Sequence, residues 1–254
     1  MTFHFDVQRR THDELNRLFH SQLREALETL HSLSRGLDAP AGDELEVAES
    51  VHEVRKTTKR LRATLRLLRG TLPTDLRRSA NDALRRAAGH LGVFRESDAR
   101  REALASLAQR FPERLVSPTL TQLDTLLRGP TSPTLSHEAL AASRRALEDV
   151  RGIEDWRVAR EGWSAVAEGL WKTYSAARRA MRHSLAQPTV ENMHEWRKRV
   201  KDHTFQLRLL EAELPELMSS HHRELSHLGK LLGDDHDLAD LHARLAHETA
   251  LEGP

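Results

Sequence analysis

The chain lacks cysteine entirely, and aromatic residues make up only 4% of its 254 positions. Without cysteine, disulfides, thiol nucleophiles and thiolate metal sites are excluded. The N-terminal residues have no apolar signal core, and no apolar run approaches the roughly 18 residues that a membrane helix needs. We therefore expect a cytoplasmic protein with no membrane partner.

An excess of one charge sign is also missing, since 39 Lys and Arg residues stand against 38 Asp and Glu residues. The charges are segregated instead. Residues 51–70 contain seven Lys or Arg residues and one acid, whereas acids gather in residues 38–49 and 234–240. A protein that coats nucleic acid with its whole surface would have a large positive net charge. The sequence therefore predicts local basic faces.

One basic segment occurs twice. Residues 51–68 and 193–210 match at a constant offset of 142 positions. The matched pairs include His52 with His194, Glu53 with Glu195, Arg55 with Arg197, Lys56 with Lys198, and Lys59 with Lys201. A repeat of this length indicates two copies of one structural unit.

On a helix, the cations of each segment share one face, and apolar residues such as Val54 and Val200 lie opposite. The first motif stripe consists of His52, Arg55, Lys56, Lys59, Arg62 and Arg66, and the second motif stripe of His194, Arg197, Lys198, Lys201 and Arg208. Like charges on one stripe repel each other, and an anionic partner would relieve that cost. A solvated helix face is the alternative interpretation, but the scarcity of acids in residues 51–70 and the repeat favour anion binding.

The periodicity is helical nearly throughout, and no segment reads convincingly as a strand. Proline and glycine break the pattern most strongly over residues 112–133. This break predicts two halves, residues 5–128 and 133–250, each a four-helix bundle. The second half should include a helix over about residues 155–186 and a turn at Gly233.

The two helices of the pattern His-x-x-Arg-Lys-x-x-Lys are each followed by a Leu-Gly-x-x-basic-acidic segment, residues 91–99 and 232–240. Together they resemble the CHAD domain, the conserved histidine α-helical domain, over essentially the whole chain. The resemblance implies one stand-alone domain over residues 1–254, all-α, with two four-helix bundles related by a pseudo-two-fold axis. It also implies a basic cleft or pore between the bundles that binds inorganic polyphosphate.

The resemblance assigns each motif stripe to one wall of this cleft. Further cations on the helices before the motifs would extend the walls: Arg17, Arg24, Arg179 and Arg182. Glu96 and Asp237 would orient cations by ion pairing. The second copy departs from the first, because Asp202 stands opposite Arg60 and Thr204 opposite Arg62, which weakens its positive field. We expect a non-catalytic protein without cofactor or metal, with association to polyphosphate granules as one option for its location.

Three rival interpretations remain at this point. A module that binds the RNA backbone would also use basic helices, but stacking platforms for single strands are scarce. Glu49 and Glu191 precede His52 and His194 with the spacing of di-iron bundles, yet the neighbouring cations would repel a metal. Residues 234–237, Asp-Asp-His-Asp, resemble part of a metal-dependent phosphohydrolase site and lack its other histidines. The four tryptophans, at positions 156, 163, 171 and 196, are expected in the core.

Overall fold

The computed structural model describes residues 3–37, 44–128 and 135–251, without the side chains of residues 44–45, 93–98, 128 and 248–251. This part of the chain is all-α, as the periodicity predicts, and contains no strand. Its helices are α1 (Thr11–Gly36), α2 (Glu44–Leu67), α3 (Thr74–His90), α4 (Gly92–Arg110), α5 (Ser117–Arg128), α6 (His137–Arg151), α7 (Gly162–Ala186), α8 (Val190–Leu210) and α9 (Pro215–Leu251).

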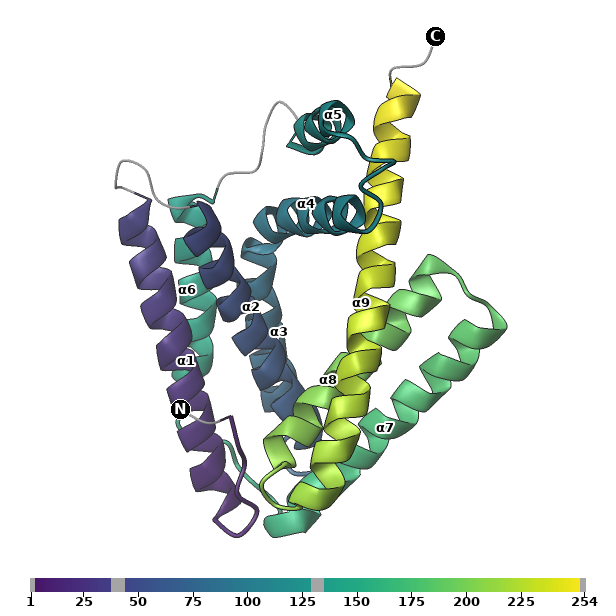
Figure 1. Cartoon of the computed structure of the whole chain (residues 1–254). Helices are drawn as coiled ribbons and strands as arrows, with labels where there is room; N and C mark the ends of the chain where they lie inside the picture. The colour runs from purple at the N-terminus through teal and green to yellow at the C-terminus, as the bar shows by residue number, and fades with distance from the viewer. Residues whose placement is uncertain (1–2, 38–43, 129–134, 252–254) are drawn as a thin grey trace.

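The larger core lies among α1, α2, α3 and α6, which pack side by side (Figure 1). Leucines from α1 and α2 fill its centre because they recur at helical spacing and burial removes them from water. Trp156 closes one end against Phe19, with 4.7 Å between ring centroids. Helix α6 contacts α1 and α3, so the packing crosses the expected boundary near residues 129–132.

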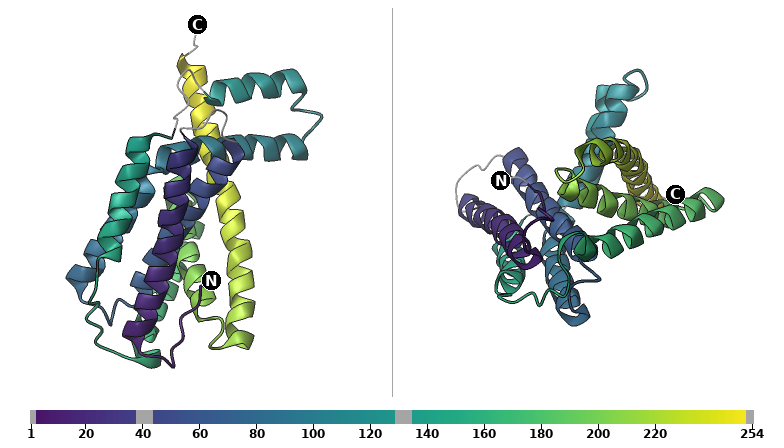
Figure 2. Two further views of the ribbon diagram at one scale, coloured as in Figure 1. Left: turned by 90° about the vertical axis from the view of Figure 1, so that its left-hand side faces the viewer. Right: turned by 90° about the horizontal axis from the view of Figure 1, so that it is seen from below.

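Helices α7, α8 and α9 form a second group, in which α8 packs against both neighbours. Helix α4 leaves the end of α3 and reaches across to α9, and α5 packs on α4 (Figure 1). Leu104, Leu127 and Leu241 join these three helices in a small separate cluster. Figure 2 shows α4 and α5 projecting from the side of the molecule, away from the larger core.

The two groups meet where α2 contacts α7 and α8. Gly169 of α7 faces the end of α2, and a Cβ there would overlap the Leu67 carbonyl and lie 2.7 Å from the Arg66 carbonyl oxygen. Glycine therefore permits an approach of two helix backbones that no other residue would allow. Gln206 of α8 ties the junction by donating to the Ala63 carbonyl at 3.2 Å and to Thr173 Oγ1 at 3.1 Å.

Three expectations need correction. Helix α9 runs through Gly233 without the expected turn, because a single interior glycine costs a helix only about 1 kcal/mol and the packing of α9 on α8 offsets that cost. The helix expected from residue 155 begins only at Gly162, whose left-handed φ of +59° turns the chain and separates the helix from the non-helical residues before it. Trp163 and Trp171 are 38% and 66% exposed, so only part of the tryptophan set is core.

Candidate anion-binding site

The first motif stripe lies along α2 beside α3. Val54, Leu61 and Leu65 are fully buried on the opposite face and fix the rotation of α2. The Arg55 guanidinium donates to the Ala88 carbonyl of α3 at 2.5 Å, and Arg62 Nε donates to Asn81 Oδ1 at 3.1 Å. These bonds hold two stripe cations in place. His52 and Lys59 are exposed on the same helix.

The second motif stripe lies along α8 beside α9. Lys201 Cε lies 3.4 Å from the position that a Cβ of Gly229 would occupy, and Arg197 Nε lies 3.6 Å from that of Gly233. In the first copy, Arg55 Nη1 lies 3.5 Å from the corresponding position at Gly92. Matched arginines therefore lie next to matched glycines, which leave room for long cationic side chains.

His194 of the second stripe contacts His236 of α9, with 3.3 Å between the two Nδ1 atoms and 4.3 Å between ring centroids. Such a contact requires one ring nitrogen to donate and the other to accept. Burial lowers the pKa of His194, and His236, Lys198 and Arg197 lower it further. Histidine here is a neutral hydrogen-bonding group until a nearby anion favours its charged form.

Two stripe cations, Lys201 and Arg62, lie where burial and neighbouring positive charges destabilise their charged forms. Burial lowers the pKa of Lys201, and so does Arg197, against the opposing effect of Asp234 and Asp237. Burial also lowers the pKa of Arg62, with a further contribution from Arg66. Both groups keep their charge at neutral pH, so the lowered values record repulsion and lost hydration that an anion would offset.

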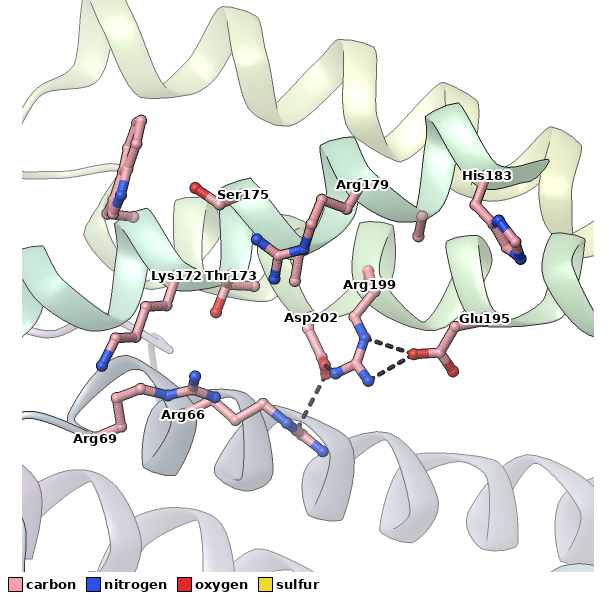
Figure 3. A pocket seen from close by; sticks show the side chains of 13 residues that line it. Arg66, Arg69, Lys172, Thr173, Ser175, Arg179, His183, Glu195, Arg199 and Asp202 are labelled. Atoms are coloured by element: carbon pink, nitrogen blue, oxygen red, sulfur yellow. Dashed lines mark hydrogen bonds and ion pairs between the residues drawn. The ribbon is translucent and has the colours of Figure 1, made fainter. Parts of the chain in front are cut away.

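A pocket of about 800 Å³ lies between α7, α8 and the end of α2 (Figure 3). Its basic side chains are Arg66, Arg69, Lys172, Arg179, His183 and Arg199. Two acids also line it. Asp202 is 3.1 Å from Arg66 Nη1 and 4.0 Å from Arg199 Nη1, and Glu195 pairs with Arg199 at 2.5 Å. Burial raises the pKa of Asp202 even though Arg66 and Arg199 act to lower it.

The other expected site residues are dispersed. Arg17 donates to Glu14 at 2.6 Å and to the His4 carbonyl, so it holds the N-terminal segment. Arg24 lines a separate hollow of about 420 Å³ between α1 and α6. Arg208 pairs with Glu211 at 2.6 Å, and Arg182 is exposed on α7. Lys56 pairs with Glu53 and Lys198 pairs with Glu195, in each case a glutamate one turn earlier on the same helix and 2.8 Å away. The side chain of Glu96 lies outside the described part.

The pocket includes cations that the motif stripes do not contain. Arg69 follows Arg66 at helical spacing, and extending the first stripe by one turn would have found it. Arg199 lies on the other side of α8 from Arg197 and Lys201, so only the position of α7 and α2 reveals its role. Lys172 belongs to a basic face of α7. From sequence spacing alone, such a face could either bind a ligand or be solvated.

Metal ligation, membrane-spanning helices and family membership are the remaining points on which the sequence made predictions. Within the described residues, no group of three His, Cys, Asp or Glu side chains could hold a metal ion. No helix in that part of the chain combines the length and the apolar character needed to cross a bilayer. Comparison with curated proteins and with solved structures gave no match. The family model of the CHAD domain matches residues 21–246, which is most of the chain, and the protein therefore belongs to the CHAD domain family.

Proposed function

We propose that this protein binds inorganic polyphosphate through the two motif stripes and catalyses no reaction on it. The observation that carries the proposal is the set of partly buried stripe cations, above all Lys201 and Arg62, whose pKa values burial and like charges lower. Membership of a family often linked to polyphosphate binding supports it. In this proposal the stripes line two walls of one basic cleft between pseudo-symmetric bundles.

The chemistry of the stripes suits a polymer without sequence. Polyphosphate carries about one negative charge per phosphate and presents no base edges. Cations one helical turn apart are spaced by about 5–6 Å, which can follow a flexible chain of oxyanions. Arg offers paired donors to phosphate oxygens, and Lys offers a point charge. Association with polyphosphate granules would follow from such binding.

RNA backbone binding is the second candidate function. One observation favours it: Trp171 is 66% exposed at the rim of the basic pocket, next to Lys172, where a base could stack. A competition at fixed salt among long polyphosphate, RNA, DNA and heparin separates the two functions. Polyphosphate should displace RNA from the protein. Displacement of polyphosphate by an equal concentration of RNA phosphates would favour the RNA function.

The direct test replaces Arg55, Lys59, Arg197 and Lys201 together with Gln, which keeps helix propensity and removes four charges. The matched control replaces four exposed cations outside the stripes, Arg35, Arg78, Arg114 and Arg145, with Gln. A charge-assisted contact contributes about 1.5–3 kcal/mol, so the loss of even two of the four contacts should weaken the binding of long polyphosphate at least about a hundredfold.

Isothermal titration calorimetry measures the affinities, and circular dichroism checks that both variants remain helical. The control should change affinity only slightly, through the general field of the protein. Equal weakening in both variants would show that net charge, rather than the stripes, attracts the polymer. A folded stripe variant with unchanged affinity would remove these residues from the site.

A further inference from the structure

We propose that the pocket between α2, α7 and α8 is a discrete site for a short linear oligophosphate, of which tripolyphosphate is the simplest probe. The ligand class rests on the proposed function, but the pocket uses a largely different set of side chains. Its volume of about 800 Å³ falls in the range of small-ligand sites, roughly 300–1,000 Å³. The motif stripes, in contrast, are extended along two helices.

The charges of the pocket favour an anion. Five Arg and Lys side chains line it, against the two carboxylates of Glu195 and Asp202. Arg69 Nε is buried with no hydrogen-bond partner among the described residues. Burial lowers the pKa of Arg69, and Arg77, Arg66 and Arg199 lower it further. A buried donor without an acceptor is costly, and a phosphate oxygen would supply the acceptor.

The donors converge from different elements. Lys172 and Arg179 are two turns apart on one face of α7, and Figure 3 shows Lys172 near Arg69, which lies in the turn after α2. Lys172 also pairs with Glu168, one turn before it on α7 and outside the lining, so an oligophosphate would compete with that carboxylate for Lys172. Thr173 and Ser175 add hydroxyl groups to the lining. Cations on three sides, with neutral donors between them, can contact the oxygens of a chain of two or three phosphates at once.

Asp202 limits the strength of this site. Its carboxylate is 3.1 Å from Arg66 and 4.0 Å from Arg199, so it occupies the position between two arginines that an incoming phosphate would use. It is 16% exposed and cannot be fully hydrated there. Replacing it with Asn keeps the size of the side chain and removes the competing charge, so oligophosphate affinity should rise. A partly unfolded variant could not produce this gain.

The test titrates the full chain with tripolyphosphate at low salt, by calorimetry. The pocket variant is Lys172→Gln with Arg179→Gln, and the matched control, at exposed positions outside the pocket, is Arg78→Gln with Arg145→Gln. We expect the pocket variant to bind at least tenfold more weakly, the control to change less than twofold, and Asp202→Asn to bind several-fold more tightly. Trp171 at the rim is a fluorescence reporter, and its signal change should vanish in Trp171→Phe.

Absence of tripolyphosphate binding to the unaltered protein, or equal weakening in pocket variant and control, would overturn the inference. ATP binding tenfold tighter than tripolyphosphate would also overturn it, because the pocket would then recognise a base. A different result would contradict the proposed function, namely normal binding of long polyphosphate by the variant in which Arg55, Lys59, Arg197 and Lys201 are all replaced with Gln. Tripolyphosphate affinity and long-polymer affinity therefore report on the two proposals independently.

Discussion

A single methyl group at Gly169 tests how closely α2 and α7 approach. In Gly169→Ala the new Cβ would overlap the Leu67 carbonyl and lie 2.7 Å from the Arg66 carbonyl oxygen. Both neighbours are backbone atoms, which cannot rotate away as a side chain can. Overpacking of this kind costs about 1–3 kcal/mol or more, and the helix propensity of Ala returns about 1 kcal/mol. Because the overlap is with backbone, the upper end of the overpacking cost, about 3 kcal/mol, applies, and we expect a net loss of about 2 kcal/mol in the free energy of unfolding.

Gly89→Ala is the matched control, since this helical glycine of α3 has nothing within 4 Å of its Cβ position. It should stabilise the protein by about 0.5–1 kcal/mol through propensity alone. Urea unfolding followed by circular dichroism and by tryptophan fluorescence gives both values. The Gly169 variant should also bind tripolyphosphate more weakly, because α2 would move relative to Lys172. If Gly169→Ala stabilises the protein as much as Gly89→Ala, the close junction of α2 and α7 is refuted.

Three further predictions concern pH and salt. Burial lowers the pKa of His203 from 6.5 to about 4. The folded protein therefore favours the neutral imidazole, and the resulting stabilisation is complete above pH 6.5. As the pH falls from 6.5 to 4, the free energy of unfolding should decrease by about 3 kcal/mol because of this group. Urea unfolding at pH 7.5 and pH 4 measures this decrease, and it should be about 3 kcal/mol smaller in His203→Phe than in the unaltered protein. The same decrease in both proteins would show that His203 does not have a lowered pKa in the folded state. Polyphosphate should bind more tightly at pH 6 than at pH 8, because the bound anion raises the lowered pKa of His194. Calorimetry in two buffers of different ionisation enthalpy should detect the proton uptake that accompanies binding. Equal affinities at the two pH values would show that His194 acts only as a neutral donor. Affinity should fall steeply with salt, and less steeply in the quadruple stripe variant; a salt-independent affinity would exclude binding by several phosphate contacts.

The local features of this protein follow from its sequence alone. Helix geometry fixes which side chains share a face, so the spacing of Arg55 and Lys59, and of Arg197 and Lys201, was sufficient to place each pair on one stripe. The repeat of the motif was also sufficient to predict the family, because the pattern depends on residue order and not on tertiary contacts. The all-helical class follows from the same periodicity.

Tertiary structure decided which of these cations gather. Arg17 has the same spacing signal as a site residue, yet it pairs with Glu14, while Arg199, on the other side of α8, joins the pocket. Asp202 meets Arg66 although 136 positions separate them. Such contacts depend on the approach of α2 to α7 and α8, and that approach is set by shape complementarity at Gly169. No periodicity along one helix encodes the distance between two helices, and for that reason the pocket could be recognised only in three dimensions.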